Sequence, residues 1–433
     1  MRTTTPNSPH THGRWRRIGS AAVATAALVF TGLGTAVQAD AASSATTSTA
    51  VTYAATPCAT PKHTGDLTCK SYRVTGGLTA FQKMQAAKTG ITPKAADATT
   101  PSGYSPTNLR SAYGLTSAAA SNGSGETIAI VDAYNDPNAE ADLATYRSYY
   151  GLSACTTANG CFKKVSQTGS TTSLPTSDAG WSEEISLDLD MASAICPLCN
   201  ITLVEATSAS YVNLGTAENE AVALGAKFVS NSYGGSESSS QTSYDTSYYN
   251  HAGVAITVSS GDSAYGAEYP ATSRYVTAVG GTKLSTSSTT RGWTEAVWRT
   301  SSTEGTGSGC SAYDAKPTWQ TDTGCTKRME SDVSAVADPA TGVSVYDSYA
   351  YLGASGWLTF GGTSVSSPII ASVFALAGNA ASIDNNYPYT HSTSLYDVTS
   401  GTNGSCTTSQ WCTARAGWDG PTGLGTPNGV GAF

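Results

Sequence analysis

The chain has 433 residues, and charged side chains make up only 12% of them, about half the roughly 25% of an ordinary soluble domain. It holds 23 Lys and Arg residues against 31 Asp and Glu residues, for a formal net charge of -8. We expect no nucleic-acid partner, because binding the phosphate backbone needs a basic face that this composition does not supply. A hydrophobic content of 39% with 44 glycines excludes disorder along the whole chain.

The N-terminal residues predict export. Three arginines between residues 14 and 17 precede an apolar run over residues 18–33, and a small-residue cleavage site follows it. We therefore assign residues 1–39 to a secretory signal and expect a secreted, extracellular protein with no membrane contact after its removal. A single membrane span is the weaker alternative, because the run is rich in Ala, Thr and Gly. The arginine pair also fits a twin-arginine export signal.

Ten cysteines follow the signal, and an even number in an exported chain predicts disulfides. The CxxC sequence at residues 196–199 could also suggest redox or zinc chemistry. A structural bridge is favoured, since no second CxxC or histidine pair completes a metal site. Short loop closure favours pairing in chain order. The expected pairs are Cys58 with Cys69, Cys155 with Cys161, Cys196 with Cys199, Cys310 with Cys325, and Cys406 with Cys412.

Two parts of the chain differ in pattern. Residues 40–103 are rich in Ala, Thr, Ser and Lys with little periodicity, and we interpret them as an N-terminal extension or short pro-segment. From Tyr104 onward, apolar strand-like runs alternate with helical patterns. Continuous apolar strands between helices predict an α/β fold, with a mostly parallel sheet covered by helices on both faces. The expected elements are strands at 127–134, 200–205, 227–232 and 254–260, and helices at 136–151, 211–225, 243–253 and 364–381.

A serine stands where a short apolar strand, residues 357–360, leads into the last long helix. Gly362, Thr363 and Ser364 form the junction. At a helix N-terminus the free backbone N–H groups and the helix dipole favour developing negative charge, and glycine lets a substrate backbone approach closely. We expect Pro368 in the first helical turn, where a missing N–H is tolerated. An ordinary N-cap is the alternative, so a nucleophilic serine requires a base.

Histidine does not supply that base. The chain has five histidines, and none is followed by the Gly-Thr type of sequence that carries the histidine of a subtilisin-type triad. Asp132, at the end of the apolar run 128–132, resembles the aspartate of such a triad, but without the histidine that interpretation fails. The base must be another kind of side chain.

Carboxyl groups are the remaining candidates. In the acidic stretch 181–191, Glu184 and Asp188 are four residues apart and share one face of a helix. A solvated acidic helix is the alternative, but two like charges at this spacing repel, and shared protons would explain them. Asp262 follows an apolar strand and is either a turn residue or a protonated acid that donates a hydrogen bond to an oxyanion.

Several motifs together resemble the sedolisin family, the serine-carboxyl peptidases with a subtilisin-like fold. The resemblance covers about 330 residues, and a chance match of so many motifs in order is remote. The matching motifs are Tyr104-Ser105-Pro106-Thr107-Asn108-Leu109, the acidic helix, Ser230-Asn231-Ser232-Tyr233-Gly234, Ser260-Gly261-Asp262, Tyr269-Pro270-Ala271, Val279-Gly280-Gly281-Thr282 and Gly362-Thr363-Ser364.

The resemblance implies a role for each candidate. Ser364 is the expected nucleophile, Glu184 the general base and acid, Asp188 the residue that orients Glu184, and Asp262 part of the oxyanion hole. It also implies that Ser232-Tyr233-Gly234 pairs with the substrate backbone as an added strand. Because Asp262 stabilises an oxyanion only while protonated, we expect an acidic working pH.

The resemblance also implies one calcium ion, bound by oxygen atoms as this cation requires. Its expected ligands are the carboxylates of Asp397 and Asp419 and the backbone carbonyls of Val398, Arg415 and Gly417. Arg415 stands where relatives often have glycine. The expected ligand is a backbone carbonyl, which is present whatever the side chain. Ordinary loop chemistry is the alternative.

We therefore expect residues 104–433 to form a single peptidase domain. The predicted function is a secreted serine-carboxyl endopeptidase that hydrolyses peptide bonds of proteins at acidic pH and acts as a monomer. The alternatives are a tripeptidyl exopeptidase, a non-enzymatic secreted binding module, and an aspartic-type peptidase that would not need Ser364. The stretch between the signal and Tyr104 is shorter than the usual pro-domain, which leaves open whether residues 40–103 stay attached.

Overall fold

The apolar runs of the sequence form one large, mostly parallel sheet in the computed structural model, which describes residues 50–91, 98–379 and 385–433. Within these ranges eight strands build the sheet, in the order β13-β12-β9-β7-β4-β6-β5 with β16 against β12. All neighbours pair in parallel except β12 and β13. The strands are β4 (Thr127–Ala133), β5 (Phe162–Ser166), β6 (Asn200–Ala206), β7 (Phe228–Asn231), β9 (Ala255–Ser259), β12 (Thr277–Thr286), β13 (Trp293–Val297) and β16 (Val333–Val336).

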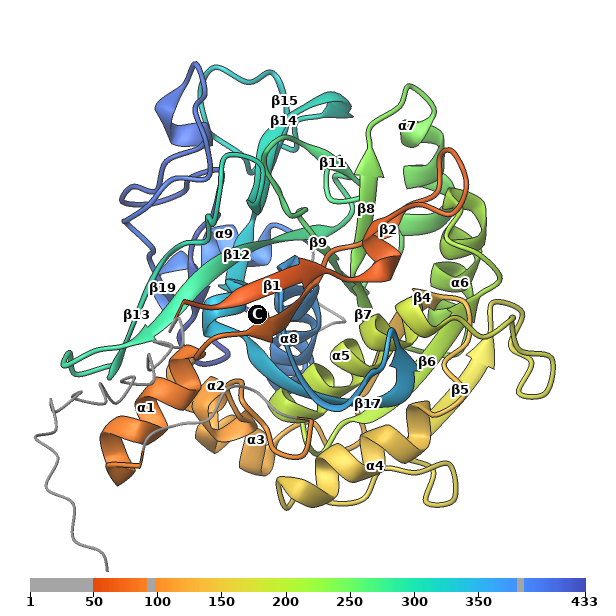
Figure 1. Cartoon of the computed structure of the whole chain (residues 1–433). Helices are drawn as coiled ribbons and strands as arrows, with labels where there is room; N and C mark the ends of the chain where they lie inside the picture. Colours follow the sequence, from red (N-terminus) through yellow and green to blue (C-terminus); the bar gives the residue numbers. More distant parts are fainter. Residues whose placement is uncertain (1–49, 92–97, 380–384) are drawn as a thin grey trace, which may run out of the picture. The chain divides into compact units, whose positions relative to one another are not determined.

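Helices cover both faces of this sheet (Figure 1). Successive side chains of a strand point to opposite faces. In β4, Ile128 and Ile130 pack in the core that includes the helices α5 and α8, whereas Ala129 and Val131 pack in the core that includes α6. The predicted α/β architecture is confirmed. The helices are α1 (Ala80–Thr89), α2 (Pro106–Ala112), α3 (Thr116–Ser121), α4 (Ala139–Tyr149), α5 (Ala179–Ile195), α6 (Tyr211–Ala223), α7 (Gln241–Tyr244), α8 (Thr363–Ala377) and α9 (Tyr387–Thr390).

Smaller sheets surround the large one and include the N-terminal part of the described chain. The sheet orders are β1-β3-β18-β17, β11-β8-β2, β10-β14-β15 and β19-β20. Their strands are β1 (Thr52–Ala55), β2 (Thr68–Cys69), β3 (Tyr72–Gly76), β8 (Tyr233–Ser236), β10 (Ser263–Tyr265), β11 (Glu268–Tyr269), β14 (Gly305–Ala315), β15 (Lys327–Glu330), β17 (Val343–Tyr351), β18 (Ala354–Gly361), β19 (Leu395–Tyr396) and β20 (Thr426–Pro427).

Two predicted helices differ from the observed ones. The helix expected at 243–253 is instead the short α7 followed by a π-helical turn, Asp245–Tyr249. The helix expected to reach residue 381 ends at Ala377, because Gly378 adopts a left-handed conformation with φ 69° and terminates it.

The described part of the N-terminal extension is not structureless. Residues 50–91 contain β1, β2, β3 and α1, and they belong to the unit Thr47–Phe433. Strands of two to five residues are too short to leave a periodic pattern in the sequence, which explains why they were not predicted. The predicted signal, residues 1–39, lies outside the described residues, and the domain boundary at Tyr104 stays a prediction.

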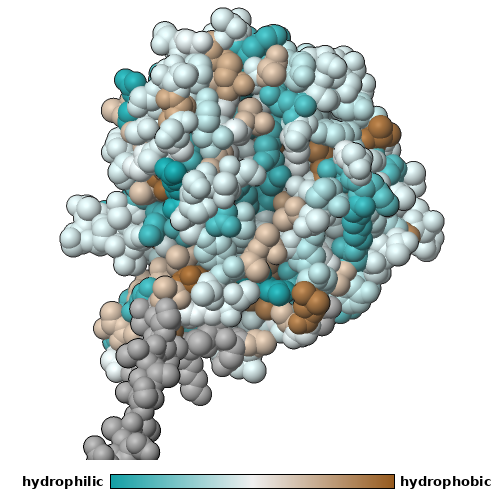
Figure 2. All heavy atoms as spheres, turned by 45° about the horizontal axis from the view of Figure 1, so that its top comes forward, coloured by the Kyte–Doolittle hydropathy of each residue, from teal (hydrophilic) through white to brown (hydrophobic). Residues whose placement is uncertain are grey.

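All five disulfides pair the cysteines in chain order, as predicted. The CxxC sequence is therefore a structural bridge between Cys196 and Cys199. In the ranges that the structure describes, no helix combines the length and apolar character needed to cross a bilayer. The molecular face in Figure 2 is mostly pale, with small hydrophilic and hydrophobic patches interspersed, as expected for a surface poor in charge.

Candidate active site

Ser364 lies at the start of α8, the helix that follows β18. Gly362 joins the two elements with φ 105°, in the region that favours glycine. A Cβ atom at this position would also lie 2.1 Å from the carbonyl oxygen of Lys70 and 2.7 Å from Oδ2 of Asp262. Both its conformation and its surroundings therefore require glycine here. Ser364 is buried, and its backbone N–H is one of the free N–H groups at the helix N-terminus.

Pro368 is the sixth residue of α8 and so lies in the second turn, not in the first turn as predicted. Proline cannot donate the hydrogen bond that the carbonyl oxygen of Ser364, four residues earlier, would receive in a regular helix. The hydroxyl of Ser232 lies 3.3 Å from that oxygen and 2.9 Å from Asp188 Oδ1, and its single proton is shared between these two acceptors. A side chain of the predicted substrate-binding segment thus partly replaces the missing donor.

The acidic helix α5 is buried along its whole length, so a solvated acidic helix is excluded. Asp178 caps its N-terminus by accepting a hydrogen bond from Trp181 N at 2.9 Å, and residues 180–195 are all buried. The helix packs against α8, β4, β17, α4 and α2. Glu184 and Asp188 share one face and are both buried. Because burying a carboxyl group is costly, each must have partners within the protein.

The other two acids of the helix have separate partners. Glu183 forms an ion pair with Arg73 of β3. Asp190 accepts a hydrogen bond from the backbone N–H of Tyr346 at 2.8 Å. Neither belongs to the serine site.

Hydrogen bonds link Ser364 to Asp188 by way of Ser232. The hydroxyl of Ser364 donates to the carbonyl oxygen of Ser232 at 3.2 Å, and the hydroxyl of Ser232 donates to Asp188 Oδ1 at 2.9 Å. Glu184 Oε2 accepts from the hydroxyl of Ser71 at 2.5 Å. Ser364 is near enough to Glu184 to lower its pKa, although its hydroxyl points to Ser232 rather than to the carboxylate in this structure.

Asp262 is placed to act in an oxyanion hole. Its Oδ1 accepts hydrogen bonds from the backbone N–H and the hydroxyl of Thr363, at 2.8 and 2.7 Å. Its Oδ2 has no hydrogen-bond partner among the described residues and, like the carbonyl oxygen of Lys70, lies close to the position that a Cβ on Gly362 would take. Burial raises the pKa of Asp262 to about 7, while the bonds from Thr363 lower it. The group is therefore neutral in acid and can donate from Oδ2.

A third buried carboxyl group, Asp132 at the end of β4, belongs to the same cluster. Burial raises the pKa of Glu184, and the nearby Asp262 and Glu183 raise it further. Burial, then the charges of Asp132 and Glu184, raise the pKa of Asp188. Both oxygens of Asp132 and one oxygen each of Glu184 and Asp188 lack partners in the described part of the chain. This arrangement favours shared protons over three separate negative charges.

Asp132 was not predicted to belong to the site, because no triad histidine accompanies it in the sequence. Its position past an apolar parallel strand was nevertheless a usable signal, since chemistry gathers at the carboxyl ends of such strands.

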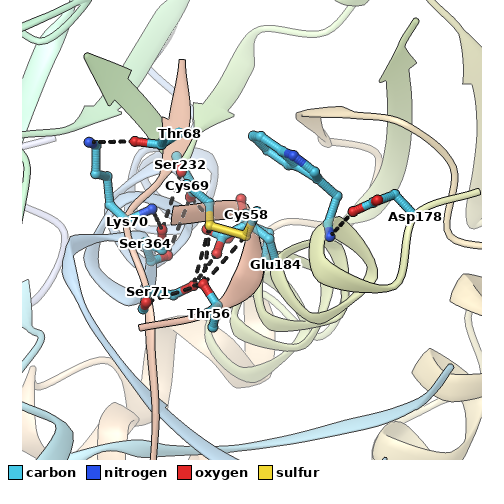
Figure 3. The surroundings of a disulfide bond; sticks show 12 residues. Thr56, Cys58, Thr68, Cys69, Lys70, Ser71, Asp178, Glu184, Ser232 and Ser364 are labelled. Atoms are coloured by element: carbon cyan, nitrogen blue, oxygen red, sulfur yellow. Dashed lines mark hydrogen bonds between the residues drawn. A yellow bond between two sulfur atoms is a disulfide. The ribbon is translucent and has the colours of Figure 1, made fainter. Parts of the chain in front are cut away.

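A segment of the N-terminal extension that was not predicted to reach the site lies across it (Figure 3). The strand β2 pairs antiparallel with β8, with Thr68 opposite Gly234 and Cys69 opposite Tyr233. Lys70 N donates to Ser364 Oγ at 2.9 Å, and Ser364 N donates to Lys70 O at 2.9 Å. The predicted substrate-binding residues thus pair with residues of the extension. No local sequence pattern indicates this contact.

Comparisons with known proteins identify the family of this chain. The profile of the Subtilase family matches residues 188–407, just over half of the chain. Kumamolisin of Bacillus sp. (strain MN-32) is 30% identical over 364 residues, which cover 76% of this chain and 63% of kumamolisin. The solved structure of Pseudomonas sedolisin, a serine-carboxyl proteinase complexed with two molecules of pseudo-iodotyrostatin, superposes with a TM-score of 0.62 at 26% identity and covers 77% of this chain and 96% of that one. The chain belongs to the sedolisin family.

Another sedolisin-family relative matches a shorter part of the chain. The curated sedolisin of Pseudomonas sp. (strain 101) is 35% identical over 179 residues, or 38% of this chain and 29% of its own length. The chain spans less than two thirds of the length of these curated relatives.

The predicted calcium loop of this sedolisin-family chain brings its two carboxylates to neighbouring backbone atoms. Asp397 Oδ2 accepts from Gly417 N at 2.9 Å, and Asp419 Oδ2 accepts from Arg415 N at 3.0 Å. Burial, with a contribution from the charge of Asp397, raises the pKa of Asp419 to about 7. Within the described residues neither carboxylate forms an ion pair with a lysine or arginine side chain. Two close carboxylates without a cationic side chain fit a hard divalent cation.

Proposed function

We propose that this protein is a serine-carboxyl peptidase that hydrolyses peptide bonds of proteins through an acyl-enzyme. The observation that carries the proposal is the position of Ser364 at the N-terminus of α8, between buried carboxyl groups on α5 and Asp262. The relative of known structure is itself described as a serine-carboxyl proteinase.

The first half of the reaction needs one proton acceptor and two oxyanion donors. Glu184 takes the hydroxyl proton of Ser364 as Oγ attacks the peptide carbonyl, and then returns that proton to the leaving amine. The backbone N–H of Ser364, which donates to Lys70 O at 2.9 Å, and the protonated Oδ2 of Asp262 stabilise the oxyanion. In the second half water attacks the acyl-enzyme and Glu184 acts again as base.

Asp188 is the residue that orients the base, from the same face of α5 as Glu184. After burial, the charges of Asp132 and Glu184 raise the pKa of Asp188, so these three carboxyl groups interact electrostatically. Because one of the oxyanion donors is a carboxylic acid, the enzyme works at acidic pH.

An endopeptidase fits this cleft better than a tripeptidyl exopeptidase. The chain segment that lies across Ser364 continues in both directions, back through Leu67 and forward into β3. Leu67 N, three residues before Lys70, still donates to Ala209 O at 2.8 Å. The cleft therefore accommodates four residues, Leu67 to Lys70, on the N-terminal side of the position of attack. An exopeptidase that releases tripeptides would need a cleft that is closed after the third of these residues.

We further propose that one calcium ion binds at Asp397 and Asp419, with carbonyl oxygens of Val398, Arg415 and Gly417. When bound, the cation neutralises the two carboxylates and fixes the loop between them. Titration of the chelator-treated protein with calcium is expected to raise its unfolding temperature, and replacing Asp397 and Asp419 by Asn should abolish that rise. An equal rise in the double variant would contradict the site.

We also propose that the protein is exported and acts outside the cell, as a monomer on protein or peptide substrates. The five disulfides and the predicted signal support the export.

A pH–rate profile tests the proposed function. Wild type, Glu184→Gln and Ser364→Ala are assayed on a denatured protein and on an N-blocked peptide from pH 3 to 8. We expect an acid optimum for wild type, a rate loss of roughly 10²- to 10⁴-fold for Glu184→Gln and no acyl-enzyme in Ser364→Ala. Full activity of Ser364→Ala would indicate an aspartic-type mechanism instead. Cleavage of only free N-termini would favour the exopeptidase, and a Ser364 that reacts with no acyl-serine probe would favour a binding module.

A further inference from the structure

The strand β5 is the last strand at one end of the large sheet (Figure 1). Among the described residues it pairs only with β6, in parallel. Cys161 O accepts from Ile201 N at 2.8 Å at the start of this pair, and Gln167 N donates to Glu205 O at 2.9 Å at its end. Every second residue of a parallel strand bonds to the same neighbour, so the odd-numbered residues of β5 face β6. The backbone N–H and C=O of Lys164 therefore point away from the sheet.

Turns cover the outward groups on either side of Lys164 but not those of Lys164 itself. The N–H of Phe162 donates to Thr156 O at 3.2 Å, and the N–H of Ser166 donates to Ser170 O at 2.9 Å. In the part of the chain that the structure describes, no backbone group bonds with the outward N–H or C=O of Lys164. The edge is thus closed at two points and open between them. A peptide residue opposite Lys164 can form both hydrogen bonds of an antiparallel pair there.

A cavity lies beside this open stretch of the edge. Its volume of about 550 Å³ falls within the roughly 300–1,000 Å³ of ordinary ligand sites. Its lining comes from α4, from β5 and from the turns on both sides of Lys164, and the apolar lining residues are Pro137, Ala141, Ala144, Phe162 and Leu174. An open strand edge next to a pocket for side chains is the arrangement by which proteins bind extended peptides through strand addition.

The charges around the cavity favour an acidic peptide. Lys163 is exposed and forms no ion pair within the described residues. The Nζ of Lys164 is 3.7 Å from the carboxylate of Glu205, beyond the length of a hydrogen bond. Glu140 also lines the cavity, but its two oxygens already accept from the N–H and the hydroxyl of Thr157, at 2.8 and 2.7 Å. An acidic residue of a bound peptide therefore complements the lysines.

We propose that the open edge of β5 at Lys164, together with this cavity, is a second binding site for the protein substrate, outside the cleft at Ser364. An extended, acidic segment of the substrate pairs with the backbone of Lys164 and places an apolar side chain in the cavity. The inference rests on the proposed function, which supplies a polypeptide as the occupant. Two sites joined by one chain raise the affinity for long substrates and leave short peptides unaffected.

Substrate length tests this proposal. Wild type, Lys164→Ala and Lys164→Pro hydrolyse reduced and carboxymethylated lysozyme, an unfolded chain, and an N-blocked peptide of about eight residues. The assay is run at about pH 5, where acidic side chains of an unfolded chain are ionised. Proline at this position removes the outward N–H but no hydrogen bond of the sheet. We expect Lys164→Pro to raise KM for the long substrate about two- to tenfold relative to Lys164→Ala, with an equal KM for the short peptide.

A second pair of variants fills the cavity without changing the strand edge. Ala144→Trp places a large side chain in the cavity from α4. Ala223→Trp is the matched control, because Ala223 is exposed on α6, which does not line the cavity. We expect only Ala144→Trp to raise KM, and only for the long substrate. This pair also decides the matter if Lys164→Pro does not fold. A KM for the long substrate that neither Lys164→Pro nor Ala144→Trp changes overturns the second site alone.

Two other results would overturn the proposal in different ways. An open strand edge can also pair with a second copy of the chain, and light scattering of wild type and Lys164→Pro detects this. We expect monomers of both proteins, whereas a wild-type dimer that Lys164→Pro dissociates would make the edge a dimer interface instead. A wild type that hydrolyses neither substrate overturns the proposed function, and this inference with it.

Discussion

The protonation of a single residue, Asp262, sets the upper pH limit of the proposed reaction. Its Oδ1 is occupied by Thr363, so only Oδ2 can face an oxyanion, and only in the neutral acid. Since burial raises the pKa of Asp262 to about 7, the neutral form prevails below that pH and is lost above it. An amide can hold the same two positions, because its oxygen accepts from Thr363 while its nitrogen donates at every pH.

We therefore predict that Asp262→Asn extends activity to higher pH. The variant should keep part of the wild-type rate in acid, and its rate should no longer fall as the pH rises through about 7. The check is kcat/KM on an external peptide from pH 4 to 9. Asp262→Ala is the control, with an expected loss of roughly 10²- to 10³-fold throughout. If the rates of Asp262→Asn and wild type fall at the same pH, another group causes the fall.

The contact between Ser232 and the helix carbonyl of Ser364 has a measurable effect on stability. Pro368 leaves that buried oxygen without its helical donor, and the hydroxyl of Ser232 lies 3.3 Å away. We predict that Ser232→Ala lowers the free energy of unfolding by about 1–3 kcal/mol. In a Pro368→Ala background, where a backbone N–H is restored, the same change should cost less. Urea unfolding of the four proteins in a Ser364→Ala background gives the coupling, and strictly additive effects would contradict this explanation.

At the scale of elements, β8 is the strand proposed to bind the substrate backbone. Gly234 has an ordinary backbone conformation, but a Cβ there would lie 2.9 Å from Glu268 Oε2 and 3.2 Å from Lys70 Cε. We predict that Gly234→Ala raises KM for peptides with lysine before the scissile bond by about tenfold with a smaller change in kcat, because the pocket for that side chain narrows. Gly266→Ala is the control, since a Cβ there has open space. Equal KM values in wild type and Gly234→Ala would place the lysine elsewhere.

The elements that could be predicted are those whose signal is local. The acidic helix α5, the parallel strands and the serine at the start of α8 follow from residue patterns of about ten residues, and the short spacing of the cysteines favoured the observed pairs. The position of the extension could not be predicted in this way. Thr68 and Gly234 are 166 residues apart in the chain, and a strand of two residues carries no periodicity. The prediction that Pro368 lies in the first helical turn was wrong for the same reason. The hydroxyl that compensates for the N–H missing at Pro368 belongs to Ser232, on a distant segment of the chain.

At the scale of the whole molecule, buried carboxyl groups dominate the response to pH. Burial raises the pKa of Glu218 and of Asp347 to about 8 and that of Asp262 to about 7. In the unfolded chain such groups titrate near pH 4. Between about pH 4 and pH 8 the folded protein therefore binds more protons than the unfolded chain, and the free energy of unfolding must fall as the pH rises. The contribution of these groups to the free energy of unfolding is fully present below about pH 4. It is lost as the pH rises through the pKa values that the groups have in the folded protein.

We predict that the unfolding temperature of the Ser364→Ala protein falls from pH 4 to pH 8, on the order of 5–10 °C. Glu218 isolates one contribution, because it is buried on α6, where burial raises its pKa and the side chain of Asn231 lowers it less. Glu218→Gln should reduce the pH dependence, since the amide fills the same space without releasing a proton, whereas the partly exposed Glu220→Gln on the same helix should not. Calorimetry at constant ionic strength and calcium concentration measures both. An unfolding temperature that is constant or rises over this range would mean that the buried carboxyl groups are ionised and compensated in the folded protein.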